Sequence, residues 1–143
     1  MGADESAVVG ENAGPLKVLC VDDNDMVLKP LVRLLEELGC VVTRATNGEQ
    51  AWKSLQAADH DLLLTDHDLP GMRGTELAVK TRQHGLRLPI IVMSGAPPWH
   101  VGLDEAQVPN AAYLGKPFGP GELVKTFNRL QGRKRLGMLN YST

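Results

Sequence analysis

The hydrophobic pattern of this chain alternates between short apolar runs and longer stretches in which apolar residues recur with helical spacing. The short runs are apolar on both faces, which is typical of strands buried inside a parallel sheet. They occupy residues 16–21, 40–45, 61–66, 88–94 and 111–116. The helical stretches lie between them, at residues 27–38, 48–56, 74–83 and 119–130.

Helices that alternate with buried strands cover both faces of a parallel sheet. The sequence therefore predicts an α/β fold: a three-layer sandwich with a five-stranded parallel sheet and helices on both faces. Residues 96–110 interrupt the pattern, because Pro98 can start a helix, Gly102 weakens it and Pro109 ends it. We expect a short or irregular fourth helix there. The expected boundaries are a flexible leader at 1–14, one domain at 15–131 and a basic tail at 132–143, whose GRKR motif is expected to be solvated.

Composition and charge limit the kinds of function that the chain can be expected to have. A chain of 143 residues with 43% hydrophobic residues can bury one core, and its net charge of −2 gives no general attraction to nucleic acid or to an anionic membrane. The N-terminus lacks a basic region followed by an apolar run, so neither a signal peptide nor a membrane span is expected. Cys20 and Cys40 lie in apolar stretches, which predicts buried free thiols and a cytoplasmic location.

Polar side chains follow the predicted strands at the edge where a parallel sheet binds its ligands. Asp22 and Asp23 follow the first strand, Asp66 ends the third, Ser94 ends the fourth and Lys116 ends the fifth. Three carboxylates at one edge repel one another unless a cation is present, and a hard oxygen-ligand ion such as Mg²⁺ suits them best. With the ammonium and hydroxyl groups, they predict a socket for a phosphoryl group.

Asp66 is the best placed of these residues to receive that group, because it ends the central strand between the acid pair and the lysine. A carboxylate can attack phosphorus to give an aspartyl phosphate, and the reaction mainly needs positioning and charge neutralisation. The LPG sequence then turns the chain, with the backbone carbonyl of Asp68 as a further candidate metal ligand.

Four motifs together resemble the response-regulator receiver domain of two-component signalling, over roughly residues 15–130. They are VLCVDDN for the acidic metal pair, LLLTDHDLPGMRG for the phosphoacceptor and its turn, PIIVMSG for the hydroxyl residue, and AAYLGKPF for the switch aromatic and the lysine. The resemblance implies a flavodoxin-like fold with strand order 2-1-3-4-5. It also implies that a histidine kinase or a histidine phosphotransfer protein phosphorylates Asp66.

The same resemblance implies roles for individual residues. Mg²⁺ would be held by Asp22, Asp23 and Asp66, and Lys116 would pair with the phosphate and precede a cis peptide bond to Pro117. Ser94 and Tyr113 would move together as the switch that remodels a partner-binding surface. Asp68 and Gly95 occupy positions that the family varies to set phosphate lifetime. Pro30 departs from the pattern, since it should kink or delay the first helix, which often docks the kinase.

Simpler structural roles account for several polar or aromatic residues near these motifs. Asp25 is expected to stabilise a helix N-terminus. His60 and His67 lack a second histidine or a cysteine at ligand spacing, so they are expected to be solvent-facing loop residues. Trp52 is expected to lie in the core.

Two competing functions remain open. One is a metal-dependent phosphatase of the haloacid dehalogenase type, which also uses an aspartate followed by a second aspartate two residues on, but places its nucleophile on its first strand and needs more chain. The other is a receiver-shaped interaction module that is never phosphorylated. The leading expectation is a phosphoacceptor that is not a turnover enzyme, either a stand-alone receiver or part of a hybrid protein, without direct nucleic-acid or membrane contacts.

Overall fold

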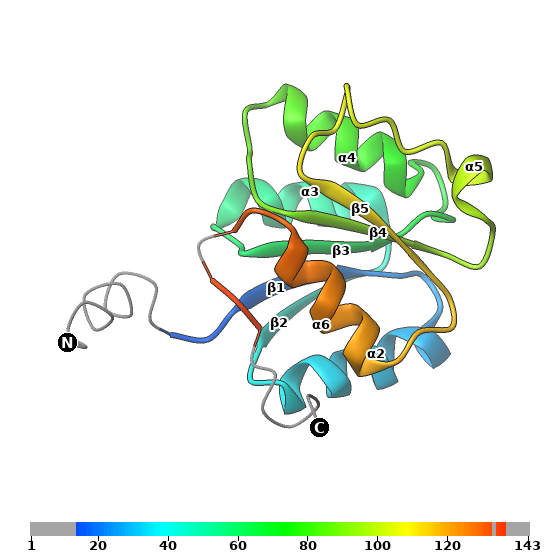
Figure 1. Cartoon of the computed structure of the whole chain (residues 1–143). Helices are drawn as coiled ribbons and strands as arrows, with labels where there is room; N and C mark the ends of the chain where they lie inside the picture. Colours follow the sequence, from blue (N-terminus) through cyan, green and yellow to red (C-terminus); the bar gives the residue numbers. More distant parts are fainter. Residues whose placement is uncertain (1–13, 133, 137–143) are drawn as a thin grey trace.

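Five parallel strands form the central layer of the chain (Figure 1). The computed structural model describes residues 14–132 and 134–136. The strands follow the order β2-β1-β3-β4-β5, which confirms the predicted fold class and strand order. Their bounds are β1 (Lys17–Val21), β2 (Val41–Ala45), β3 (Leu62–Asp66), β4 (Ile90–Ser94) and β5 (Ala111–Gly115).

Helices cover both faces of this sheet and complete the three layers (Figure 1). Alternate strand residues face opposite sides. Leu62 and Leu64 of β3 therefore join one core cluster with residues of α2 and α6, whereas Leu63 joins the other cluster with residues of α3, α4 and α5. The bounds are α2 (Asp25–Glu37), α3 (Gly48–Ala57), α4 (Gly74–Gln83), α5 (Pro98–Val101) and α6 (Pro120–Arg129). Within the described ranges, no helix is both long and apolar enough to cross a bilayer.

Local sequence signals explain where α2 begins and where α5 ends. Asn24 caps α2 by accepting a hydrogen bond from the amide of Met26, so Asp25 lies in the first turn rather than at the cap. Pro30 does not delay the helix, which is continuous from Asp25 to Glu37. The fourth helix is short, as predicted: α5 has four residues, and Gly102 ends it with a φ of 71°.

Buried sulfur atoms lie in the core, as predicted. Cys20 and Cys40 are both buried and free. Burial raises the pKa of the Cys20 thiol to about 12 and that of the Cys40 thiol to about 11. Both side chains therefore stay protonated and behave as small apolar groups.

Two expectations about polar segments were wrong. His67 is 2% exposed rather than solvent-facing, and His60 is half-buried. Within the segment expected to be a solvated tail, the described residue Leu136 is instead 3% exposed and belongs to a core cluster. Trp52 is partly buried and packs against the opposite core cluster. The leader residues 1–13, Arg133 and residues 137–143 lie outside the described residues.

Candidate functional site

Three carboxylates meet where β1 and β3 end. Oxygen atoms of Asp22, Asp23 and Asp66 all lie within 4.8 Å of one another, and we call these residues the acid cluster. Asp22 is 1% exposed and Asp66 6%, whereas Asp23 is exposed. Parallel pairing of β1 with β3 places the two strand ends at one edge of the sheet, so the adjacent Asp22 and Asp23 form one anionic site with Asp66, which is distant in sequence.

Lys116 joins this cluster from the end of β5. Its Nζ lies 2.7 Å from Oδ1 of Asp66 and 3.1 Å from Oδ2 of Asp22. Burial would lower the pKa of the Lys116 ammonium, but the hydrogen bonds to Asp66 and Asp22 outweigh it and raise that pKa. The lysine is therefore charged and partly neutralises the site. The peptide bond between Lys116 and Pro117 is cis.

Burial dominates the electrostatics of Asp66. It raises the pKa of this carboxyl, the Lys116 ammonium lowers it, and the charges of Asp22 and Asp68 raise it further. The net shift is upward, so one lysine does not fully compensate for the burial and the neighbouring acids. A divalent cation would supply the missing positive charge, and a set of carboxylate oxygens matches the ligands that Mg²⁺ prefers. The acid cluster therefore fits a magnesium ion.

Ser94 and Tyr113 converge on the loop that follows β4. Ser94 is fully buried, and its Oγ accepts a hydrogen bond of 3.0 Å from the amide of Ala96. The Tyr113 hydroxyl donates a hydrogen bond to the carbonyl oxygen of the same Ala96. A Cβ atom at Gly95 would meet open space, with no atom within 4 Å. Both predicted switch residues are thus hydrogen-bonded to the backbone of Ala96, in the short loop that leads into α5.

A glycine that the sequence analysis did not single out supports the phosphoacceptor strand. Gly74 is the first residue of α4, and its amide donates a hydrogen bond of 2.9 Å to the carbonyl oxygen of His67. A Cβ atom at Gly74 would lie 2.3 Å from the backbone oxygen of Asp66. The backbone of Asp66 is also held by the Thr65 hydroxyl, which donates to the same oxygen at 2.9 Å. In the sequence, the only local indication of this close contact is a glycine at the start of a helix, and glycines occur at helix starts for many other reasons.

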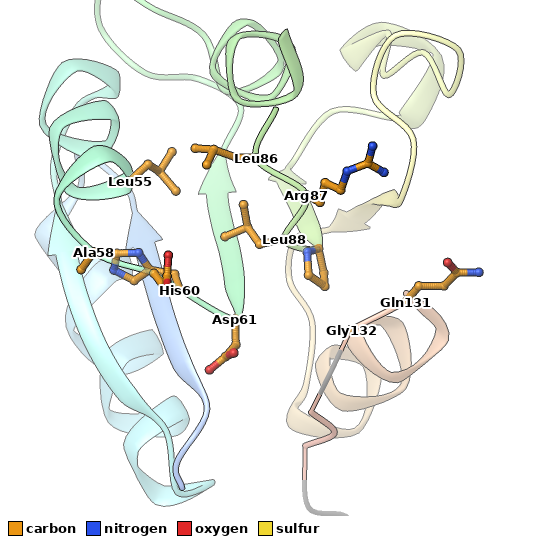
Figure 2. Close-up of a pocket in the computed structure, with 11 residues that line it drawn as sticks. Leu55, Ala58, His60, Asp61, Leu86, Arg87, Leu88, Gln131 and Gly132 are labelled. Atoms are coloured by element: carbon orange, nitrogen blue, oxygen red, sulfur yellow. The ribbon is translucent and has the colours of Figure 1, made fainter. Parts of the chain in front are cut away.

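A separate hollow of about 330 Å³ opens at the opposite edge of the sheet (Figure 2). Leu55, His60, Asp61 and Arg87 are among its lining residues, and Figure 2 shows the Arg87 guanidinium directed away from the leucines. Asp61 precedes β3 whereas Asp66 ends it, so the strand separates the hollow from the acid cluster by roughly 16 Å. None of the residues that we assign to the phosphoryl socket lines this hollow.

A family model of the response regulator receiver domain matches residues 18–128 of the chain. The response regulator receiver protein CpdR of Brucella abortus is 35% identical over 113 residues, which are 79% of this chain and 93% of that protein. The sensor histidine kinase GacS of Pseudomonas protegens is 37% identical over 83 residues. That match covers 54% of this chain but 9% of the kinase, so the chain spans a small part of this relative.

A solved structure with the same architecture is the receiver domain of sensor histidine kinase PA1611 from Pseudomonas aeruginosa, which has a magnesium ion coordinated in its active-site cleft. Its TM-score is 0.73 at 28% identity, with 82% of this chain and 98% of that chain covered. The chemotaxis response regulator CheY4 of Vibrio cholerae also has a TM-score of 0.73 at 28% identity, with coverage of 82% and 99%.

Proposed function

Because the chain belongs to the response-regulator receiver family, we propose that it is a phosphoacceptor of a two-component phosphorelay and that Asp66 takes the phosphoryl group. The donor would be a phosphohistidine of a histidine kinase or of a histidine phosphotransfer protein. A carboxylate oxygen of Asp66 attacks phosphorus, the new P–O bond forms, and the P–N bond to the imidazole breaks. The observation that carries this proposal is the acid cluster with the Lys116 ammonium hydrogen-bonded into it.

Lys116 has a role before and after phosphorylation. Its Nζ bridges Asp66 and Asp22 in the unphosphorylated protein. On transfer, it would exchange the Asp66 oxygen for a phosphoryl oxygen and make one charge-assisted hydrogen bond there. Magnesium, when bound, would neutralise further phosphoryl charge. Asp22, Asp23 and Asp66 would hold it, with the backbone carbonyl of Asp68 as an additional ligand.

Ser94 and Tyr113 would carry the signal away from the site. If Ser94 Oγ shifts to donate a hydrogen bond to a phosphoryl oxygen, it keeps the hydrogen bond that it accepts from the Ala96 amide only when Ala96 moves with it. The Ala96 carbonyl is also the acceptor for the Tyr113 hydroxyl. A displacement of Ala96 would therefore also move the Tyr113 side chain and α5, which follows Ala96 in the chain. We propose that this coupled movement changes the surface that an output partner reads.

Two neighbouring positions would set how long the phosphate persists. Asp68 is exposed beside the acceptor and can orient a water for attack on the acyl phosphate. The open space at Gly95 leaves room for that water. We propose that the chain acts as an acceptor that loses its phosphate by self-catalysed hydrolysis, not as a turnover enzyme on other substrates.

A phosphatase of the haloacid dehalogenase type fits less well. That family places its nucleophile on the first strand of its sheet, whereas Asp66 ends β3, the central strand of a receiver-ordered sheet. An interaction module that is never phosphorylated would not need a lysine bonded to two buried carboxylates. Both alternatives make different predictions in the experiment below.

The proposal is tested by incubating the chain with acetyl phosphate and Mg²⁺ and reading its intact mass. We expect the mass of one phosphoryl group to be added, and we expect EDTA or Asp66→Asn to abolish the addition. Asp25→Asn removes an exposed acid outside the cluster and is the matched control, which should be phosphorylated like the parent. No addition to the parent would favour the unphosphorylated module, and steady hydrolysis of a generic phosphomonoester would favour the phosphatase.

A further inference from the structure

Three arginines line a broad hollow where β4 and β5 begin, at the edge of the sheet opposite the acid cluster. Its volume is about 870 Å³. The lining comes from the end of α4, the loop that leads into β4, the segment before β5 and the end of α6. We call it the arginine hollow, and its charged lining residues are Arg82, Arg87, Arg129 and Glu105. Because Ala111 begins β5 and Lys116 follows its end, the hollow lies roughly 16 Å from that lysine.

The positive charge of the arginine hollow is not balanced by neighbouring acids. Among residues 14–132 and 134–136, none of the three guanidinium groups lies within 4.0 Å of a carboxylate oxygen. Three cations and one glutamate leave a net charge of +2 among the lining residues, in a chain whose net charge is −2. Burial and the neighbouring charge of Arg87 lower the pKa of Arg82, so two guanidinium groups repel each other here. A bound anion would relieve this repulsion.

The backbone holds Arg82 in place. Its Nε donates to the Pro109 carbonyl oxygen at 2.8 Å, and its Nη1 and Nη2 donate to the carbonyl oxygens of Leu86 and Asn110, each at 3.0 Å. A guanidinium carries five N–H groups, so these three bonds leave two for a ligand. Asn110 is itself fixed, because its side chain makes two hydrogen bonds to the backbone of Gln131, at 2.7 and 2.8 Å. This wall of the hollow is therefore preformed, which lowers the entropic cost of binding.

Arginines at helix C-termini can serve only to compensate the helix dipole and its terminal carbonyl groups. At the end of α4, however, backbone amides already bond to terminal carbonyl oxygens, as that of Gly85 does to Arg82 at 3.0 Å. Arg87 belongs to the loop after α4, and Figure 2 shows its guanidinium turned away from the leucines of the smaller hollow. Arg87 and Arg129 are both exposed, so both side chains can turn toward a ligand in the arginine hollow.

The arrangement of these donors indicates the chemistry of the ligand. Arginine forks match the oxygens of phosphate groups bidentately, and two linked phosphates can accept from several guanidinium groups at once. The negative charge of such a group also matches the net +2 of the lining residues. A concave volume of about 870 Å³ is in the range of small-molecule sites. The lining also offers side-chain amides to a polar ligand body, those of Gln83, Gln107 and Gln131.

We propose that the arginine hollow binds a small molecule that carries a diphosphate group. Arg82 is its fixed anchor, and Arg87 and Arg129 close on the phosphate oxygens from the loop after α4 and from the end of α6. The site lies at the other edge of the sheet from Asp66, and its ligand binding does not depend on phosphorylation of that residue.

Calorimetric titration of the full chain with pyrophosphate in Mg²⁺-free buffer tests the site. We expect saturable binding to one site. Arg87→Gln with Arg129→Gln should weaken this binding at least tenfold, and Arg82 is left intact because it holds the backbone. The matched control is Arg33→Gln with Arg44→Gln, which removes two exposed arginines elsewhere and should bind within twofold of the parent. Equal weakening in the two variants would overturn the proposal, because it would show attraction to overall charge alone, and so would a lack of saturable binding.

Backbone amide NMR signals locate the bound anion. Pyrophosphate should shift the signals of residues 82–87 and 107–111 and leave those of residues 22–24 and 66–68 unchanged. The reverse pattern would place the anion at the acid cluster and overturn the proposal.

ADP and a hexaglutamate peptide then identify the class of ligand in the same titration. Tighter binding of ADP than of pyrophosphate would identify a nucleotide as the ligand, and equal or weaker binding would identify an inorganic polyphosphate; either result supports the site. Hexaglutamate that binds more tightly than pyrophosphate would overturn the proposal, because the hollow would then recognise an acidic protein segment.

Discussion

Replacing Gly74 by alanine should disturb the strand that carries the phosphoacceptor. The added methyl group would lie 2.3 Å from the backbone oxygen of Asp66 and 2.9 Å from the Cα of His67. Nonbonded heavy atoms rest at about 3.5 Å, so the Asp66 carbonyl would have to move by roughly 1 Å. Both obstacles are backbone atoms, which cannot rotate away as a flexible side chain can. The start of α4 and the end of β3 must therefore separate.

The size of the effect follows from three contributions. Overpacking a tight contact costs about 1–3 kcal/mol, and straining the hydrogen bond from the Gly74 amide to the His67 carbonyl costs about 0.5–1.5 kcal/mol more. The better helix propensity of alanine offsets up to about 1 kcal/mol. We expect a net loss of about 2–3 kcal/mol in the free energy of unfolding. For a domain of this size, that lowers Tm by roughly 6–9 °C.

Denaturant unfolding and phosphorylation by acetyl phosphate measure the two consequences. Moving Asp66 by about 1 Å should slow phosphorylation at least tenfold, because catalysis by positioning is sensitive to such displacements. Gly121→Ala is the matched control, since a Cβ atom there meets nothing within 4 Å and its helical position should gain up to about 1 kcal/mol. A Gly74→Ala protein within about 0.5 kcal/mol of the parent, phosphorylated at the parent's rate, would refute the reasoning.

Four further predictions concern charge, burial and mobility. Lys116→Ala should lower the free energy of unfolding by about 1–3 kcal/mol in Mg²⁺-free buffer, because two buried carboxylates lose the ammonium that neutralises them. Mg²⁺ should restore most of this stability. A loss of stability that Mg²⁺ does not change would argue against the metal site. The pKa of the Cys20 thiol is raised from 9.0 to about 12 by folding. The contribution of this thiol to the free energy of unfolding is therefore fully present below pH 9, and it falls as the pH rises toward 12, because the thiol ionises first in the unfolded chain. The parent should therefore lose about 2 kcal/mol more than Cys20→Ala between about pH 9 and 11 in denaturant titrations. Asp68→Asn should lengthen the lifetime of the phosphate, measured by its decay in intact mass, whereas a shortened lifetime would mean that the carboxylate only repels hydroxide. The one-turn helix α5 should exchange its amides faster than α2 and α6, and beryllofluoride should protect it; unchanged exchange would remove α5 from the switch.

Most of the fold could be predicted because the strands are read from local patterns. β3 and β4 are buried at every position, and continuous apolar runs report that directly. The same holds for the short α5, since Pro98 and Gly102 act on the backbone locally whatever surrounds them. Strand ends then indicated which polar residues converge, because parallel strands share one ligand-binding edge.

What could not be predicted depends on contacts between distant segments. His67 follows two polar residues and looks like part of a loop, yet its amide donates to the Met93 carbonyl and its side chain is buried. Nothing near Gly74 in the sequence reveals that the backbone of Asp66 passes above it. Likewise, Leu136 follows a basic run that is typical of a solvated tail, yet its backbone is hydrogen-bonded to the Asn128 side chain and the neighbouring Lys134 pairs with Asp61.

Chemical trapping of the phosphorylated residue tests the central claim most directly. Borohydride reduces an aspartyl phosphate to homoserine, so phosphorylation with acetyl phosphate and Mg²⁺ followed by reduction and peptide sequencing marks the acceptor. We predict homoserine at position 66, dependent on Mg²⁺, with none at Asp22 or Asp23. Homoserine at either of those residues, or phosphate recovered on the imidazole of His67, would contradict the assignment of Asp66 as the phosphoacceptor.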